Sequence, residues 1–246
     1  MVFYLSLIRI SKFLSMSGIT SRRKAEKLIA LGRIKVNGQV VNDLAYKVNS
    51  TADILMLDNS IINFENKKIY IKLFKPKGYI TSLQDELGRK TVFELIDIKE
   101  RIFPVGRLDK DTRGLLLLTN DGNFAFKMTH PKFEVKKLYQ VYAKGIPSSL
   151  DIKTLENGIE IEDLTTSPCR ITIIKKYKDS CYLLVNIHEG KKRQIRKMFE
   201  FIGHPVIDLL RLKIGSIDLG NLKEGEWAYL NALELDKLNI LQEEKK

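Results

Sequence analysis

The chain has 246 residues, and 42 Lys and Arg against 30 Asp and Glu give it a formal net charge of +12. This length allows one sizeable hydrophobic core and a smaller second domain, and the charge weakly favours a polyanionic partner over an ordinary basic surface. Two cysteines outside any Cys-x-x-Cys pair exclude a disulfide framework, and three widely spaced histidines predict no metal site.

The two thiols and the apolar start of the chain indicate the cellular compartment. Cys169 and Cys181 both lie in strand-like runs, so we expect ordinary buried thiols in a reducing cytosol. The segment Val2 to Ile8 is apolar, but it is short and has no basic residues before it, unlike a signal peptide. No other stretch approaches the length of a membrane-spanning helix. We therefore expect a cytoplasmic protein with no membrane among its partners.

Residues 1–65 have the pattern of a separate small domain. Three apolar residues spaced for one helical face predict a first helix, which Gly18 is placed to end: Ile10, Phe13 and Leu14. Ser21, or Thr20 before it, can cap a second helix that closes at Gly32. The apolar face of this second helix is formed by Ala25, Leu28 and Ile29.

Positive charge is concentrated in this small domain. Residues 1–47 contain nine Lys or Arg against two acids, a local net charge of +7. The pair Asn37-Gly38, between Ile34, Val36 and Val40, predicts a tight β-hairpin. A basic helix start joined to a basic hairpin suits RNA phosphates, although a solvated amphipathic helix has the same composition. The candidate RNA-binding residues are Arg22, Arg23, Lys24, Lys27, Arg33 and Lys35.

Residues 66–246 are expected to form the larger second domain, after a polar linker over residues 58–68. Short helical stretches separate five β-rich runs: residues 69–74, 114–119, 138–143, 169–177 and 181–188. These runs lack the regular strand–helix alternation of a parallel sheet. The pattern predicts an α+β fold, with a helix-helix-hairpin first domain and a second domain around a mixed, largely antiparallel β-sheet.

The most informative stretch is the loop Gly106-Arg107-Leu108-Asp109-Lys110-Asp111-Thr112-Arg113-Gly114, which precedes four leucines. Glycines at both ends allow a sharp turn or the close approach of a ligand. A carboxylate flanked by Arg107, Lys110 and Arg113 stays ionised, which suits nucleophilic or base chemistry. On chemistry alone Asp109 and Asp111 are equal candidates, and either residue is also able to serve as a loop cap or a surface ion-pair partner.

A second basic cluster lies at the start of a predicted helix. Five cations occupy seven positions in Lys191-Lys192-Arg193-Gln194-Ile195-Arg196-Lys197. Cations at a helix N-terminus are unfavourable without an anion nearby, and RNA phosphate, Asp109 or Glu189 are the candidates. A solvated basic face is the simpler alternative.

One aromatic residue is a further candidate. In the strand-like run Lys137-Leu138-Tyr139-Gln140-Val141-Tyr142, alternation places Tyr139 on the face opposite Leu138 and Tyr142. Most strand tyrosines pack against a sheet. The functional alternative is a ring that stacks on a base extruded from RNA.

Together these motifs resemble a known family. Gly106-Arg107-Leu108-Asp109, Lys137-Leu138-Tyr139 and Arg193-Gln194-Ile195-Arg196 have the order and approximate spacing of the pseudouridine synthase motifs. The run GRLDKDTRGLLLLTNDG resembles the branch that modifies ribosomal RNA, which Lys75-Pro76-Lys77-Gly78 and Gly225-Glu226-Trp227 also fit. The order Ser21-Arg22-Arg23, Ala25 and then residues 32–38 resembles the alpha-L RNA-binding motif, a small domain shared with a ribosomal protein.

The resemblance implies roles for three residues. Asp109 matches the catalytic aspartate, which sets Asp111 aside; Tyr139 matches the tyrosine that packs on the target base; Arg196 matches the basic residue that pairs with the catalytic carboxylate. The other residues expected to bind RNA are Arg107, Lys110, Arg113, Lys191, Lys192 and Arg193. Lys191-Lys192 stand where the branch often has Arg-Asn, and Lys197 where Arg is usual. These changes keep charge but lose bidentate geometry.

The reaction that the resemblance implies breaks the uracil–ribose bond, turns the base and rejoins it through a ring carbon, without a cofactor or metal. The expected substrate is one uridine, flipped out of ribosomal RNA or of a ribosomal assembly intermediate, by an enzyme acting as a monomer. The alpha-L residues resemble large-subunit enzymes more than small-subunit ones, and a small-subunit substrate stays open. Two other classes also stay open: a non-catalytic RNA-binding assembly factor, and an RNA N-glycosidase that releases free uracil.

Overall fold

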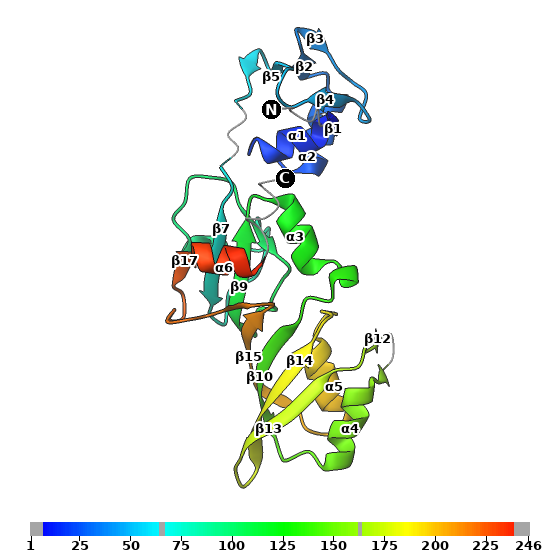
Figure 1. Cartoon of the computed structure of the whole chain (residues 1–246), viewed down its shortest axis with the longest axis vertical. Helices are drawn as coiled ribbons and strands as arrows, with labels where there is room; N and C mark the ends of the chain where they lie inside the picture. Colours follow the sequence, from blue (N-terminus) through cyan, green and yellow to red (C-terminus); the bar gives the residue numbers. More distant parts are fainter. Residues whose placement is uncertain (1–6, 64–66, 162–163, 239–246) are drawn as a thin grey trace. The chain divides into compact units, whose positions relative to one another are not determined.

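The computed structural model of the chain describes residues 7–63, 67–161 and 164–238 (Figure 1). The chain divides into two compact units. The first comprises Met1–Ile69, Ile98–Ile102 and Asn120–Gly122, and the second comprises Tyr70–Asp97, Phe103–Thr119 and Asn123–Lys246. Most of the apolar start, Val2 to Ile8, lies outside the described residues. Within the described ranges, no helix is both long and apolar enough to cross a membrane.

The first unit contains both helices that the sequence predicts, α1 (Ile10–Met16) and α2 (Arg22–Ala30). The side chain of Ser21 caps α2 by accepting a hydrogen bond from the backbone amide of Lys24 at 3.3 Å. Gly18 and Gly32 follow the two helices with φ of +75° and +67°, a backbone conformation that glycine adopts without strain. Both helices and their end points are therefore confirmed.

Short strands complete the first unit. In its described residues, β1 (Leu7–Arg9) pairs with β4 (Lys47–Asn49), and a four-stranded sheet has the order β3 (Gln39–Val40), β2 (Ile34–Val36), β5 (Leu55–Leu57) and β6 (Ser60–Ile61). The hairpin predicted at Asn37-Gly38 joins β2 to β3. The core beneath this sheet is formed by fully buried residues that include Ile10, Leu14, Ile29, Ile34 and Leu55.

The predicted linker over residues 58–68 is wrong in its first part. Asp58 and Asn59 form the turn between β5 and β6, with φ of +48° and +69°. Asp and Asn tolerate positive φ, so the polar residues that resemble a linker here make a hairpin turn instead. Ile62 is buried in the core of the first unit, and residues 64–66 lie outside the described residues.

In its described residues, the second unit is built on a nine-stranded sheet. Its main order is β13 (Arg170–Lys176), β14 (Ser180–Ile187), β10 (Lys137–Lys144), β15 (Val206–Ile214), β9 (Arg113–Thr119), β7 (Tyr70–Lys75) and β17 (Trp227–Tyr229). β16 (Ile217–Asp218) pairs with β15, and β8 (Phe103–Val105) pairs with β9. Only β15 and β9 among these described neighbours are parallel, which confirms a mixed, largely antiparallel sheet.

Helices pack on both halves of this sheet. α4 (Ser149–Asn157) and α5 (Gln194–Phe201) lie beside β13, β14, β10 and β15 (Figure 1). α3 (Gly122–Thr129) and α6 (Ala232–Lys237) contribute to the apolar core on the half that contains β9 and β7. The remaining elements are the 3₁₀ helices η1 (Val92–Leu95) and η2 (Pro131–Phe133), and the pair β11 (Glu160–Ile161) and β12 (Leu164–Thr165).

The parallel junction between the two halves of the sheet positions the functional loop. β15 and β9 share a short register, in which Leu210 lies opposite Arg113 and Arg211 lies opposite Gly114. Gly114 has φ of +117°, and a Cβ atom at this position would lie 2.3 Å from the carbonyl oxygen of Arg211. Only glycine fits, because the two backbones approach closely here. The loop from Gly106 to Arg113 is therefore held against β15 at its C-terminal end.

Candidate active site

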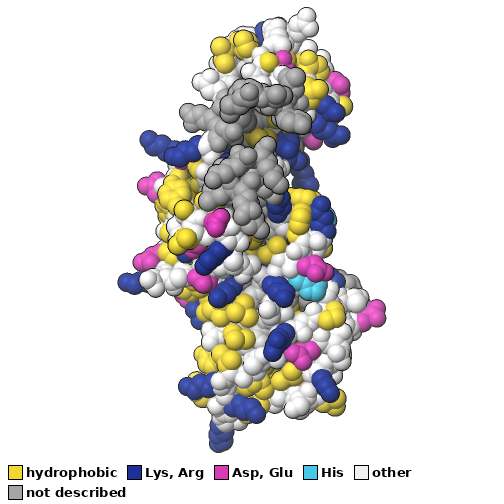
Figure 2. Space-filling model, in the orientation of Figure 1, with side chains coloured by type: hydrophobic (Ala, Val, Ile, Leu, Met, Phe, Trp, Pro, Cys, Tyr) yellow, Lys and Arg dark blue, Asp and Glu magenta, His cyan; other side chains and the backbone are white. Residues whose placement is uncertain are grey.

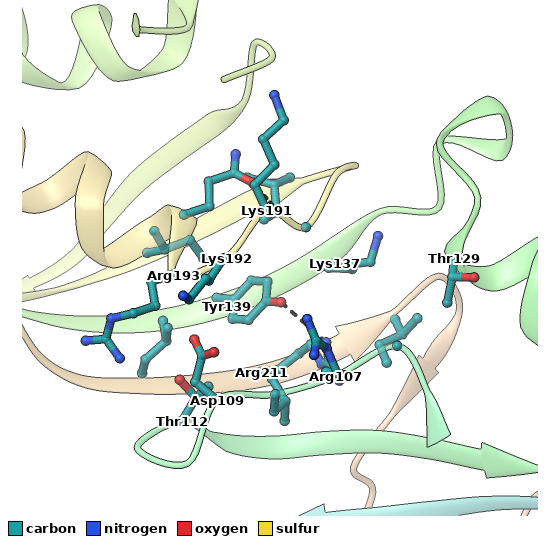
Figure 3. A pocket seen from close by; sticks show the side chains of 18 of the residues that line it. Arg107, Asp109, Thr112, Thr129, Lys137, Tyr139, Lys191, Lys192, Arg193 and Arg211 are labelled. Carbon is teal, nitrogen blue, oxygen red and sulfur yellow. Dashed lines mark hydrogen bonds between the residues drawn. The ribbon is translucent and has the colours of Figure 1, made fainter. Parts of the chain in front are cut away.

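A pocket of about 270 Å³ opens beside this junction, within the second unit (Figure 3). Its walls come from the loop before β9, from β10 and β15, and from the segment that leads into α5. The lining includes Arg107, Asp109, Tyr139, Arg193 and Arg211. The fold thus brings together three motifs that are far apart in the sequence.

Asp109 contributes a free carboxylate to this pocket. Figure 3 shows its side chain pointing into the cavity toward the ring of Tyr139. The residue is half-buried, and within the described part of the chain its carboxylate has no hydrogen bond or ion pair. Its backbone, by contrast, is fixed, since its carbonyl oxygen accepts from the amide of Thr112 at 3.1 Å. A rigidly placed but unpaired carboxylate is available to a ligand.

Lys75, at the end of β7, anchors the loop that carries Asp109. Its side chain is fully buried, and its Nζ donates to the carbonyl oxygens of Thr112 at 2.7 Å and of Asp109 and Pro76, each at 3.0 Å. Burial lowers the pKa of Lys75 to about 8, although the nearby carboxylates of Asp111 and Asp109 oppose this shift. In the sequence Lys75 is only the first residue of the motif Lys75-Pro76-Lys77-Gly78. Its burial is not predicted, because a lysine at a strand end is usually exposed.

Arg196 contacts Asp111 rather than Asp109, so the pairing implied by the resemblance is not found. Its Nε lies 3.2 Å from Oδ2 of Asp111, and its Nη2 donates to the backbone oxygen of that residue at 3.0 Å. Nη1 of Arg193 lies 3.1 Å from the same Oδ2. Burial raises the pKa of Asp111, but Arg196 and Arg193 lower it by more, and the net shift is downward.

The backbone at Arg193 explains this difference. The helix predicted to begin near Lys191 begins at Gln194, because Arg193 has a left-handed conformation with φ of +53°. Arg196 therefore lies in the first turn of α5 and reaches the far end of the loop, outside the pocket lining. The anion expected near the helix start is supplied by Asp111 and by Glu189, whose carboxylate accepts from the Gln194 side chain at 2.6 Å.

Tyr139 is buried and lines the pocket, on the strand face that alternation predicts. Its hydroxyl accepts from Nη1 of Arg211 at 3.4 Å, and Arg211 is itself fixed because its Nε donates to the carbonyl oxygen of Leu115 at 2.7 Å. Burial lowers the pKa of the neighbouring Lys137, and Arg211 lowers it further. Arg211 is not predicted from the sequence, where its sole signal is a cation within the apolar strand β15.

The remaining basic residues divide into two groups. Arg107, Lys110 and Lys192 are exposed and form no ion pair with any described residue, whereas Lys191 lies 3.5 Å from Glu189. Arg113, which follows Asp109 in the loop sequence, begins β9, and its guanidinium reaches Asp208 on the adjacent strand at 2.8 Å and Glu224 at 2.7 Å rather than the carboxylate of Asp109. These two carboxylates raise the pKa of Arg113 despite its partial burial.

The candidate RNA-binding residues of the first unit lie on α2 and β2. On α2, Arg22, Arg23, Lys24 and Lys27 are exposed. On β2, Arg33 forms an ion pair with Asp58 and Lys35 donates to the side chain of Asn59 at 2.8 Å. The hydrogen bond from Arg33 lowers the pKa of Asp58. Lys and Arg side chains also outnumber acidic ones on the face shown in Figure 2.

Comparisons with known proteins agree with this geometry. The model of the RNA pseudouridylate synthase family matches residues 69–201, and the model of the S4 domain matches residues 8–54. Ribosomal large subunit pseudouridine synthase B of Bacillus subtilis (strain 168) is 42% identical over 241 residues, which cover 97% of this chain and 98% of that protein.

Two further relatives extend the similarity over nearly the whole chain. An uncharacterized RNA pseudouridine synthase of Aquifex aeolicus (strain VF5) is 45% identical over 233 residues, covering 94% of this chain and 93% of that protein. A crystal structure of a pseudouridylate synthase has 30% identity and a TM-score of 0.68, and the match covers 95% of this chain and 100% of that one. The fold and the pocket thus define an RNA-modifying isomerase with an RNA-binding domain at its N-terminal side. The chain belongs to the RNA pseudouridylate synthase family, and the resemblance seen in its motifs is confirmed.

Proposed function

We propose that this enzyme converts one uridine of large-subunit ribosomal RNA to pseudouridine, with Asp109 as its essential carboxylate. The observation that carries the proposal is the unpaired carboxylate of Asp109 inside the pocket, opposite the ring of Tyr139 (Figure 3). Similarity to the large-subunit enzyme of Bacillus subtilis supports the choice of RNA. In this proposal residues 1–65 are the RNA-binding domain and residues 66–246 are the catalytic domain, working as a monomer in the cytoplasm.

The lining of the pocket favours a base that has left its helix. The carboxylate of Asp109 and the ring of Tyr139 line this pocket, and a base that stays paired inside an RNA helix cannot reach the atoms of a pocket lining. The target uridine is therefore flipped into the cavity, and its ring packs on Tyr139. Arg107, Lys191, Lys192 and Arg193 line the pocket with exposed side chains, and Lys110 is exposed directly after Asp109 in the loop; these cations hold the flanking phosphates.

Asp109 then acts on the ribose of the flipped nucleotide. One route is attack on the anomeric carbon, and the other is removal of a proton from the neighbouring sugar carbon to give a glycal. In both routes the bond from the ring nitrogen to the sugar breaks, and its electron pair stays with uracil. A ring carbon next bonds to the anomeric carbon. In the first route this breaks the bond between the sugar and Asp109, and in the second route the proton held by Asp109 returns to the neighbouring sugar carbon. The ring carbon then loses its own proton, while the freed nitrogen gains one. The atoms of uridine balance, as an isomerisation requires.

Arg196 has a positioning role in this mechanism. It holds the end of the loop through Asp111, and Lys75 holds the middle of the loop through the backbone of Asp109. The two contacts fix the loop at Asp109 itself and at Asp111, two residues after it. Preorganisation of this kind lowers the barrier, because the catalytic group does not reorganise during the reaction.

The experiment that tests the proposal measures tritium release. Large- and small-subunit ribosomal RNA, labelled on the uracil ring carbon that becomes glycosidic, is incubated with wild type and with Asp109→Asn. We expect release from the large-subunit RNA by wild type alone, with RNA binding retained by the variant. Turnover by Asp109→Asn contradicts the role of the carboxylate, and release from the small-subunit RNA alone contradicts the substrate assignment.

A further inference from the structure

An exposed aromatic cluster lies on α3 and η2 and consists of Phe126, His130, Lys132 and Phe133. The ring centroids of Phe126 and Phe133 are 5.8 Å apart, and that of His130 lies 4.6 Å from Phe126. The ammonium group of Lys132 lies 4.7 Å from the centroid of Phe133 and 5.3 Å from that of Phe126. Three rings and one cation thus form a single continuous surface.

The aromatic cluster is not part of the hydrophobic core. Phe126 is 48% exposed and Phe133 is 40% exposed, whereas Phe124 and Met128 on the same helix are buried. Helix α3 therefore has an ordinary buried face, and Phe126 extends from its other side into water beside Phe133 of η2. Exposing two phenyl rings side by side forgoes the free energy of their burial, and contiguous apolar surface of this kind marks an interaction site.

The backbone holds the rings in place before any ligand arrives. Glu134, directly after Phe133, has φ of +47° and ψ of +35°, a left-handed conformation that is uncommon for a residue other than glycine. The amide of Lys132 donates to Nδ1 of His130 at 3.3 Å. The amide of His130 also donates to the carbonyl oxygen of Phe126 at 2.8 Å, and that of Phe133 to the carbonyl oxygen of His130 at 3.1 Å. These hydrogen bonds turn the chain after α3 and bring Phe133 against Phe126, and Glu134 ends the turn.

The aromatic cluster adjoins the active site. Met128 and Thr129, which lie between Phe126 and His130 in the sequence, line the pocket, and Figure 3 shows Thr129 at its edge. The Thr129 side chain also lies against the catalytic loop, since a Cβ atom at Gly106 would be 3.6 Å from its Cγ2. A nucleotide adjacent to the one in the pocket therefore passes close to the cluster.

We propose that the aromatic cluster stacks an unpaired nucleotide of the substrate RNA next to the target uridine. This inference rests on the proposed function, because the pocket must hold that uridine. Unpaired RNA bases are recognised by stacking on aromatic rings, and a neighbouring cation meets the phosphate. Lys132 supplies a charge of the right sign within 5.3 Å of both phenyl rings. The combination of aromatic rings with a cation favours RNA, rather than an apolar protein surface, as the ligand of the aromatic cluster.

The first test compares RNA binding by Phe126→Ala and Phe133→Ala with that of Phe201→Ala. Phe201 is a matched control, because it is 54% exposed at the end of α5, away from the cluster and the pocket lining. We expect each cluster variant to raise the Kd for transcribed large-subunit RNA by about 5- to 100-fold, as the loss of one stacking contact predicts. For the Phe201→Ala control, both the Kd and the single-turnover rate constant at saturating RNA should stay within about twofold of wild type.

The second test measures stacking directly. The variant Phe126→Trp places an indole in the cluster, and the emission of Trp227 is subtracted by using wild type. We expect the indole emission of Phe126→Trp to be quenched when the RNA is added, with a midpoint that matches the Kd of wild type. The emission of Phe201→Trp should not be quenched. Unchanged Kd in both alanine variants overturns the inference. So does emission typical of a buried indole without RNA, because another protein surface would then cover the cluster.

Failure of this inference is distinguishable from failure of the proposed function. If wild type releases tritium and both alanine variants bind RNA normally, the stacking surface is wrong and the reaction stands. If wild type releases no tritium from either RNA but the alanine variants bind less tightly, the stacking surface stands and the proposed substrate falls.

Discussion

The side-chain ammonium of Lys75 donates a hydrogen bond to the backbone carbonyl oxygen of Asp109 at 3.0 Å. The contact joins a fully buried lysine to the backbone of the residue whose carboxylate points into the pocket. Lys75 also donates to Thr112, so one ammonium group fixes the loop at two points. The position of the pocket carboxylate thus depends on a charge that is itself out of water.

Replacing Lys75 by methionine should reduce both stability and turnover. Lys75→Met removes the lysine donor from three carbonyl oxygens, of which that of Thr112 is buried and that of Asp109 keeps the amide of Thr112, and we expect the free energy of unfolding to fall by about 2 kcal/mol. The single-turnover rate should fall at least about tenfold, because the loop is no longer held. Urea denaturation and tritium release measure the two effects. Lys77→Met is the control: Lys77 is exposed and pairs with Asp208, so its loss should cost less than about 1 kcal/mol.

The same lysine should make stability depend on pH in the alkaline range. Burial lowers the pKa of Lys75 from 10.5 to about 8 in the folded protein, so between these values the unfolded chain binds more protons. The free energy of unfolding therefore rises as the pH rises from about 8 to about 10.5, and the deprotonation of Lys75 contributes up to about 3 kcal/mol to this rise. Below pH 8 the contribution of this group does not change with pH. Urea denaturation of wild type and Lys75→Met between pH 7 and pH 10 isolates the contribution. A difference between the two proteins that stays constant with pH would contradict it.

The two aspartates of the loop should respond differently to neutralisation. Asp111→Asn removes the ion pairs to Arg196 and Arg193 but leaves the pocket carboxylate, so we expect turnover to fall by about tenfold and not to vanish. Asp109→Asn should abolish turnover while RNA binding persists. Single-turnover tritium release and filter binding distinguish the two. The reverse order of activities would show that the two roles are exchanged. Comparable activity in both variants would show that the carboxylate of Asp109 has no special role.

The sequence predicted those parts of the fold that depend on local spacing. Ser21 and Gly32 bound a helix because capping acts within a few residues, and Tyr139 faces the pocket because strand alternation has a period of two. The partner of Arg196 was not predictable in this way. It depends on the left-handed backbone of Arg193, which delays the start of α5 and turns Arg196 toward Asp111.

Buried cations were missed for a related reason. The sequence around Lys75 is typical of a strand end, and that around Arg211 is typical of an apolar strand. Neither local sequence indicates that the cation is buried. The burial of Arg211 follows from the pairing of β15 with β9, and that of Lys75 from the pairing of β7 with β9, segments that are far apart in the chain. Propensity and periodicity describe a residue's neighbours in sequence, whereas the environment of these two cations is set by the sheet.

Adding a single methyl group at Gly114 should disrupt this sheet junction. In Gly114→Ala the new Cβ would lie 2.3 Å from the carbonyl oxygen and 2.5 Å from the amide nitrogen of Arg211, and φ of +117° is itself strained for alanine. Because backbone atoms on both sides cannot yield without breaking the β9–β15 register, we expect the free energy of unfolding to fall by about 3 kcal/mol or more. Gly190→Ala is the matched control, since no atom lies within 4 Å of its Cβ position. Urea denaturation of the two variants tests the argument: similar stability would mean that the strands separate at little cost, and that the loop bearing Asp109 is held by Lys75 rather than by the sheet.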